Sequence, residues 1–411
     1  MNLERSIVLT PDASAVPAVK PAVIARADDN VAVGYLRAFI TVMVVAHHAV
    51  LAYHAFAPAP PASLVAEPRW WQAFPVVDSQ RWGGFTLFVG FNDVFFMALM
   101  FFLSGLFVWN SLQRKGSKTF LKDRALRLGL PFLVSAAVLA PLAYYPSHLQ
   151  SGAASFWEQW RSLGNWPAGP AWFIWVLLAF GAVAAGISRL MPGWGDSLGR
   201  LASRAGRRPA LFFGLLVALS AAAYVPMALA FTPFAWTTFG PFSFQTSRLL
   251  FYAVYFLAGI AVGAHGLQKG LLAADGRLAR RWPLWLLAAL GAFGTVFLLT
   301  IVIMTAHAGS RPWEIAGGLA FTLSCAASSF AFLALFVRFA GRRFRPLDSL
   351  RDNAYGIYLV HYAFASWLQL SLLRAPLSAP LKGAAVLLGA LALSWAATHV
   401  LRRLPGVARM I

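Results

Sequence analysis

The chain of 411 residues has one cysteine and few charged side chains. The cysteine, Cys325, lies in an apolar run, so no disulfide can form within the chain, and we interpret it as a small buried hydrophobe. Charged residues make up 12% of the chain, against about 25% in soluble globular proteins. This scarcity of charge excludes an ordinary soluble enzyme. Because no Cys/His cluster has metal-ligand spacing, we also predict no metal site and no bound cofactor.

Hydrophobic residues instead account for 59% of the chain, and they gather in long runs. About 20 consecutive apolar residues cross a bilayer as a helix. We therefore predict an all-α, polytopic integral membrane protein with about ten transmembrane helices. The predicted spans are residues 31–54, 88–110, 128–146, 170–190, 210–231, 247–267, 284–306, 314–338, 352–373 and 383–401. Pro131 and Pro141 interrupt the third of them.

Acidic residues number only 14 against 34 Lys and Arg, which gives a net charge of +20. Such an excess can indicate nucleic-acid binding, but these cations fall in short clusters between apolar runs rather than on one basic face. With both termini in the cytoplasm, about 26 cations lie on the cytoplasmic side and about six outside, which is the positive-inside bias. The pattern predicts cytoplasmic termini and no nucleic-acid partner.

The chain divides into three predicted parts. Residues 1–30 are rich in Ala, Pro and Val and form a flexible cytoplasmic N-terminal segment, residues 31–403 form one ten-helix membrane domain, and residues 404–411 form a short cytoplasmic tail. The two longest outer connections are aromatic. Their tryptophans are interpreted as interfacial belt residues, with a sugar-stacking surface as the alternative: Trp70, Trp71, Trp157, Trp160 and Trp166.

The first span, RAFITVMVVAHH, carries Arg37 and His48 within an apolar helix. Eleven residues turn a helix about 20° beyond three full turns, so these two side chains share one face, about 16 Å apart. They are too far apart to act on one atom, so they would contact different parts of one long ligand, or two ligands entering from opposite sides. His47 falls off this face and is expected to pack. The alternatives are that Arg37 snorkels to the interface and that His48 only packs.

Two more spans carry ionisable groups at membrane depth. Asp93 returns to the depth of His48 and would orient its imidazole, with an interface-solvated or structurally paired aspartate as the alternative. In NAYGIYLVHYAF, His361 lies near the midplane on a stripe with Tyr355 and Tyr358, with a structural hydrogen bond as the alternative role.

Two other positions receive structural interpretations. Arg248 lies near the outer end of its span and is expected at the membrane interface. Ser104 and Gly105 are small residues, which suit close packing between helices.

Four motifs, taken in order, resemble those of the acyltransferase-3 family of bacterial membrane acyltransferases. They are the arginine and histidine at Arg37 and His48, the stretch FFLSGLFVWNSLQRKGSKTFLKDRALRLGLP, the segment WFIWVLL from Trp172, and YGIYLVH. The likeness covers most of the chain, although the carboxylate usual before FF in the family is absent. RAF…H…Y, with FND before FFLSG, looks closest to the glucan succinyltransferase-like branch.

The resemblance implies an acyl-CoA donor on the cytoplasmic side and an acceptor hydroxyl on a glycan. By match, His48 is the family's essential histidine, Arg37 its partner arginine, and His361 lies on the later histidine motif. Arg124 and Arg127 fall on the basic motif associated with donor binding, with positive-inside charges as the alternative. The candidate substrate- or donor-binding residues are thus Arg124, Arg127, Asp93, Tyr358 and Trp172.

The predicted function is a membrane-bound O-acyltransferase in the bacterial cytoplasmic (inner) membrane, with multiple crossings. It would move an acetyl- or succinyl-class group from acyl-CoA to a cell-envelope glycan or glycolipid. His48 would act as general base or as nucleophile, and Arg37 would bind the donor's phosphate portion. One alternative is a transporter or flippase that uses the same residues as a substrate or proton path. Another is a membrane scaffold.

Overall fold

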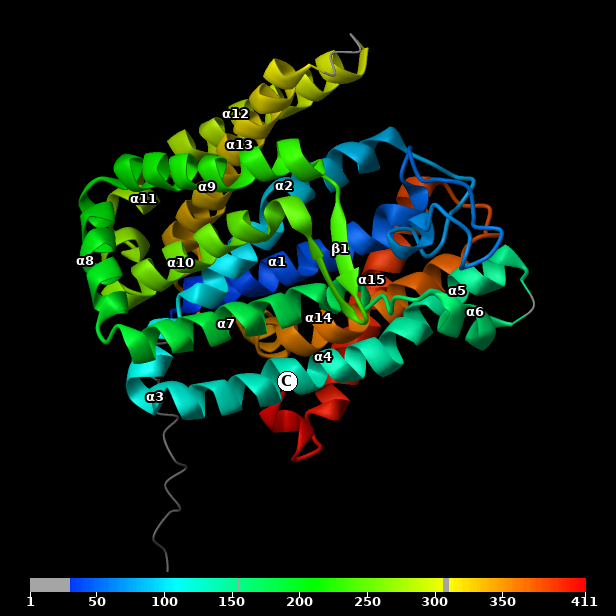
Figure 1. Ribbon diagram of the computed structural model, residues 1–411, viewed down its shortest axis with the longest axis horizontal. Helices are drawn as coiled ribbons and strands as arrows, with labels where there is room; N and C mark the ends of the chain where they lie inside the picture. Colours follow the sequence, from blue (N-terminus) through cyan, green and yellow to red (C-terminus); the bar gives the residue numbers. More distant parts are fainter. Residues whose placement is uncertain (1–29, 154, 306–309) are drawn as a thin grey trace, which may run out of the picture.

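The computed structural model describes residues 30–153, 155–305 and 310–411, so the predicted N-terminal segment lies outside them apart from residue 30. These residues are mostly helical, with one β-hairpin (Figure 1). The helices are α1 Val31–Val50, α2 Gly83–Gly105, α3 Val108–Arg124, α4 Leu130–Val134, α5 Ala140–Ser151, α6 Phe156–Ser162, α7 Trp172–Leu190, α8 Trp194–Arg207, α9 Pro209–Phe231, α10 Leu249–His265, α11 Arg277–Arg280, α12 Trp282–Thr305, α13 Arg311–Phe339, α14 Arg345–Ser371 and α15 Ala379–Leu401.

Nine stretches of the described chain are long and apolar enough to cross a membrane, which confirms the predicted all-α polytopic class. Helix α14, which covers the remaining predicted span, is long enough with 27 residues. It is less apolar because it carries Asn353, His361 and Gln369, all buried. These polar groups are tolerated because α14 packs against α1, α5 and α15 rather than facing lipid alone. The orientation of the termini stays a prediction.

Helix α1 lies inside the bundle, where it contacts α2, α13, α14 and α15 (Figure 1). It begins after Asn30, whose side chain accepts a hydrogen bond from the Val33 N–H at 3.1 Å, as an N-cap residue does. Helices α12 and α13 pack together and project obliquely from the rest of the bundle in Figure 1. We call the end of the bundle with Arg37 the basic end, and the end with Trp71 the aromatic end.

Helices α2 and α10 approach so closely that glycine is required on both. A Cβ atom at Gly105 would overlap the carbonyl oxygen of Phe256, and one at Gly259 would overlap that of Phe102. The prediction that Gly105 serves close helix packing is therefore confirmed.

The basic segment after α2, expected to be a connection, is helical. Helix α3 covers Val108–Arg124 and is kinked at Gly116, whose φ of 73° lies in the left-handed region that favours glycine. The helical path then continues to Ser151 through two π-helical turns, residues 125–129 and 135–139. Each turn comes just before a proline. The third predicted span is therefore a continuous helix that contains π-helical turns near these two prolines.

Pro131 lacks an N–H and leaves the carbonyl of Arg127, four residues earlier, without its helical donor. The hydroxyl of Tyr355 on α14 donates to that carbonyl at 2.6 Å. The proline therefore creates a contact between helices.

The same arrangement occurs 15 residues further along the chain, at Pro146. Its missing N–H leaves the carbonyl of Leu142 without a donor, and the indole N–H of Trp367 donates to that oxygen at 2.9 Å. Both donors belong to α14, so this helix holds the proline-containing segment at two levels.

A β-hairpin connects α9 to α10 and was not predicted. Strands β1 (Trp236–Phe239) and β2 (Phe242–Gln245) are antiparallel, with Trp236 opposite Gln245. The backbone N–H of Trp166 donates to Gly240 in its turn at 2.8 Å, which attaches the hairpin to the chain before α7.

At the aromatic end, Trp71 and Trp160 are buried, with exposed fractions of 1% and 7%. They pack around Tyr144, so their interpretation as interfacial belt residues is wrong. The connections after α1 and α5 fold over the bundle and supply core there. Trp70, Trp157 and Trp166 are exposed.

Asp78, in the connection after α1, forms an ion pair of 2.7 Å with Lys382 of α15. Both side chains are 1% exposed. The pair fastens the folded connection to the bundle.

Candidate functional site

The first and fourteenth helices bring two of the predicted histidines together. Nδ1 of His48 lies 2.9 Å from Nε2 of His361, and Nδ1 of His361 lies 2.6 Å from the carbonyl oxygen of Tyr358. A carbonyl only accepts, so Nδ1 of His361 carries a proton. In the neutral pair, Nε2 of His361 then accepts from Nδ1–H of His48. This chain leaves a lone pair on Nε2 of His48.

The two histidines differ in accessibility. His361 is 0% exposed, whereas His48 is half-buried. The ring of Tyr362 meets His48 edge to face, with 4.9 Å between ring centroids. The amide of Gln369 donates to the carbonyls of His48 and Ala49, at 2.8 and 3.0 Å, where α1 ends. His48 is therefore the reachable member of a pair that α14 holds in place.

His47 packs, as predicted, and its ring also meets that of His48 edge to face with 5.4 Å between centroids. Its ring stacks on Phe96 of α2 with 5.2 Å between centroids. Its buried Nδ1 has no hydrogen-bond partner among the described residues.

Arg37 lines a separate cavity of about 220 Å³ at the basic end. Arg351 and Asp352 of α14 line the same cavity. The structure thus brings His48 and His361 together, and keeps Arg37 apart from them, as the helical spacing predicts.

Asp93 is engaged by Arg248 rather than by His48. The guanidinium binds both carboxylate oxygens, at 3.0 and 2.6 Å, and lies over the ring of Phe321. Arg248 is 3% exposed, so its predicted place at the membrane interface is wrong. The role of orienting His48, expected for Asp93, belongs to His361.

Arg124 and Arg127, predicted to bind the donor, lie at the join between α3 and the first π-helical turn. Arg124 is half-buried, with its guanidinium 5.0 Å from the Phe120 ring centroid. Arg127 is exposed, and its backbone carbonyl receives the Tyr355 hydroxyl.

The aromatic candidates, Tyr358 and Trp172, contact other residues of the protein. The hydroxyl of Tyr358 donates to the carbonyl of Pro170. Trp172 meets Trp236 of the hairpin edge to face at 5.5 Å and also packs against Tyr252. Each lies close to the elements that surround the histidine pair.

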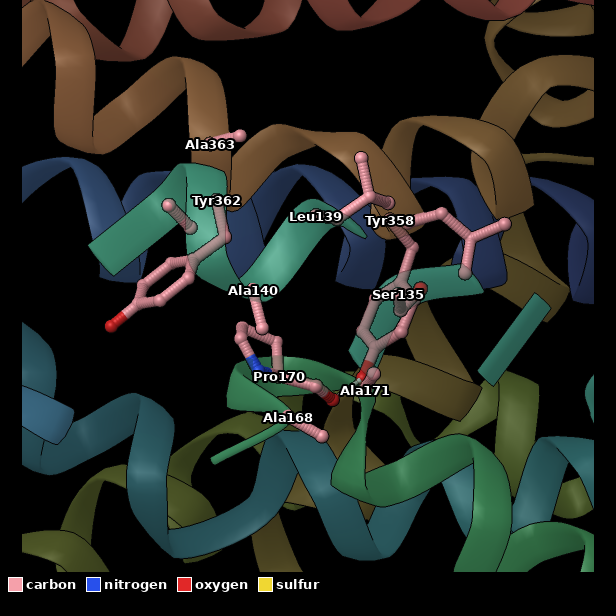
Figure 2. A pocket seen from close by; sticks show the side chains of 11 residues that line it. Ser135, Leu139, Ala140, Ala168, Pro170, Ala171, Tyr358, Tyr362 and Ala363 are labelled. Carbon is pink, nitrogen blue, oxygen red and sulfur yellow. Dashed lines mark hydrogen bonds between the residues drawn. The ribbon is translucent and has the colours of Figure 1, made fainter. Parts of the chain in front are cut away.

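A small cavity of about 20 Å³ lies between α14 and the π-helical stretch (Figure 2). Tyr358 and Tyr362 line it from α14, and Ser135 lines it from the π-helical turn. The buried hydroxyl of Ser135 has no partner among the residues that the structure describes. This volume suits about one water molecule.

Some residues of the site were missed in the sequence. Gln369 and Tyr362 follow His361 on its own helix, so a polar residue late in that span was the available signal. Arg351 was counted among the positive-inside charges. No three His, Cys, Asp or Glu side chains lie close enough to hold a metal ion within residues 30–153, 155–305 and 310–411.

The chain is similar in sequence to a known protein family. A family model described as an acyltransferase domain, that of the acyltransferase-3 family, matches residues 30–399, nearly the whole described chain. Searches of curated proteins and of solved structures found no significant match. The matched range includes Arg37, His48 and His361. With its helical membrane bundle and its paired intramembrane histidines, the chain belongs to the acyltransferase-3 family and is an acyltransferase.

Proposed function

We propose that this acyltransferase moves an acetyl- or succinyl-class group from a cytoplasmic acyl-CoA-type donor to a hydroxyl of a cell-envelope glycan or glycolipid. Its place is the bacterial cytoplasmic (inner) membrane. The observation that carries the proposal is the hydrogen-bond chain from His48 through His361 to the Tyr358 carbonyl. Such a chain fixes one histidine tautomer and leaves its outer nitrogen basic.

In the proposed reaction, Nε2 of His48 removes the proton from the acceptor hydroxyl as its oxygen attacks the thioester carbonyl. The new C–O bond forms, the C–S bond breaks, and the leaving thiolate takes the proton back from His48. Nε2 of His361 accepts a hydrogen bond from Nδ1–H of the transient imidazolium. The Tyr358 carbonyl accepts a hydrogen bond from His361 and fixes its ring. His48 is the catalytic residue and His361 positions it.

Arg37 binds phosphate of the donor in this proposal. Arg37 lies about 16 Å from His48 along the axis of α1, a distance that an extended thioester arm spans. Arg124 and Arg127 add phosphate contacts. The donor then lies along α1 with its phosphates at the basic end and its thioester at the histidine pair.

The test uses purified protein in lipid nanodiscs with radiolabelled acetyl-CoA or succinyl-CoA and glycans extracted from the host envelope. We expect His48→Ala to lower transfer by about 10²–10⁴-fold, the range for loss of a general base. His399→Ala, at an exposed histidine of α15 that stacks on Trp395, is the matched control and should retain transfer. If His48→Ala and Arg37→Ala both leave glycan acylation intact, the proposal is wrong.

The transporter alternative makes a different prediction. A flippase would move glycan or proton without forming a new ester, and acyltransferase family membership favours the enzyme. Mass spectrometry of envelope glycans, with and without the protein, separates them, because only the enzyme adds the acyl mass.

A further inference from the structure

The cavity at the basic end contains a second arginine whose role is not accounted for by the reaction above. The cavity of about 220 Å³ is bounded by Arg37 of α1 and by Arg351 and Asp352 of α14. Leu103 and Phe107 form its apolar side. It is smaller than the roughly 300–1,000 Å³ of a site for a whole drug-sized ligand. It therefore suits the end of an extended molecule.

We propose that Arg351 binds a phosphate group of the acyl donor in this cavity, together with Arg37, and that Gly34 makes the room for it. This rests on the proposed function, since it takes the donor to be a phosphate-bearing thioester. Two guanidiniums from different helices on one cavity form a site for a doubly charged oxyanion, because each presents paired N–H groups in a fixed plane.

Arg351 is held in position by acidic neighbours. Its Nε donates to Asp352 at 3.0 Å, its Nη1 lies 3.7 Å from Asp348, and its side chain is 12% exposed. Asp348 is fixed in turn by the hydroxyl of Tyr35 on α1, at 3.0 Å. A guanidinium has five N–H groups, so carboxylates and a phosphate can be bound at the same time. The ion pairs orient Arg351 before a ligand arrives.

Gly34 lets Arg351 lie close to α1. A Cβ atom at position 34 would be 2.6 Å from Cδ of Arg351 and 3.4 Å from its Cγ. Any larger residue must therefore push the arginine side chain away from its present path. Because the clash is with a side chain, Gly34→Ala changes the cavity while leaving both arginines in the chain.

The charge around the cavity favours an anion. Arg37 and Arg351 face it, and Arg402 adjoins it, donating to the backbone carbonyl of Asp352 at 2.7 Å. Among the residues that the structure describes, two carboxylates, Asp348 and Asp352, lie near these three cations. The Asp352 side chain is half exposed, so solvent and salt screen its interaction with a charge in the cavity.

The experiment compares two thioester donors on the full-length protein in nanodiscs. One is acetyl-CoA, and the other is S-acetyl-N-acetylcysteamine, which carries no phosphate. We expect Arg351→Gln to raise the KM for acetyl-CoA at least tenfold with kcat changed less than about twofold, and to leave the KM for the phosphate-free thioester unchanged. Gly34→Ala should act in the same direction, and Arg351→Lys should retain part of the affinity.

Arg342→Gln removes the same charge from the exposed connection before α14 and serves as the control, with no change in either KM. The inference is overturned if Arg351→Gln leaves the KM for acetyl-CoA unchanged or raises both KM values equally. If His48→Ala still abolishes transfer in that case, only the Arg351 inference fails and the proposed function stands. Equilibrium dialysis with free coenzyme A tests the site without turnover: loss of binding in Arg351→Gln supports the site even if no acyl transfer is found, and unaltered binding contradicts it.

Discussion

At His48, the direction of each hydrogen bond decides which nitrogen can work as a base. The carbonyl of Tyr358 accepts, so protons are fixed along the chain and Nε2 of His48 keeps its lone pair. A substitution at His361 therefore acts through His48 rather than on a substrate.

This predicts a graded series at position 361. The amide oxygen of Gln lies near the place of Nε2 and can accept from His48, whereas Leu cannot. We expect His361→Leu to reduce kcat by about 10²-fold, with His361→Gln in between and KM little changed, because only the base is disturbed. Initial rates over a range of donor concentrations measure this. Equal loss in both variants would mean that His361 serves packing alone.

The Asp93–Arg248 pair is a residue-scale feature of stability. Removing the carboxylate leaves a guanidinium that is 3% exposed without its countercharge, whereas Asp123 pairs with Lys115 near the surface. We expect Asp93→Asn to cost on the order of 3 kcal/mol in unfolding free energy and Asp123→Asn to cost clearly less, because its ion pair is exposed to solvent. Thermal unfolding in detergent compares the two. Equal shifts in the melting temperature would contradict the assignment.

Between elements, α14 satisfies carbonyls that prolines have left open. Tyr355→Phe removes the donor to the Arg127 carbonyl and should cost about 1 kcal/mol. In a Pro131→Ala background, the new N–H of residue 131 can serve the same carbonyl, so Tyr355→Phe should cost much less there. A double-mutant cycle of unfolding free energies measures the difference. Additive effects would show that proline and tyrosine act independently.

The contact between α2 and α10 depends on glycine. Gly259→Ala places a methyl group against the backbone of Phe102 and should cost about 1–3 kcal/mol or more by overpacking. Gly291→Ala, on exposed α12 with nothing within 4 Å, is the control and should be neutral or stabilising by up to about 1 kcal/mol. Melting temperatures of the two variants test this, and a Gly259 variant as stable as the control would rule out the close approach.

At this scale, the sequence predicts the features that depend on neighbouring residues in the chain, and not those that depend on long-range packing. Apolar runs locate most helices because lipid selects each span by its own composition, and helical spacing alone separates Arg37, His48 and His47. The partners of His48 and Asp93 were not predictable, because they lie 313 and 155 residues away and depend on how α14 and α10 pack. The buried tryptophans were misinterpreted for the same reason, since indoles suit both an interface and a core.

For the whole molecule, the charge bias predicts that α8 faces the cytoplasm and α6 the outside. The single native cysteine is 0% exposed and can be replaced by alanine. We then expect Ser162→Cys on α6 to react with a membrane-impermeant maleimide in intact cells, and Ser197→Cys on α8 to react only after permeabilisation. Both serines are exposed, so accessibility is matched. The reverse pattern would invert the topology.

The polar character of α14 has a consequence for biogenesis. A helix that carries Asn353, His361 and Gln369 gains little by leaving the translocon for lipid on its own. Its stabilising contacts are with α1, α5 and α15. Helices α1 and α5 are synthesised long before α14 emerges from the ribosome, and α15 is synthesised after it. Membrane integration of α14, the helix that holds His48 in place, therefore depends on the earlier spans being retained nearby until synthesis of α14 and α15 is finished.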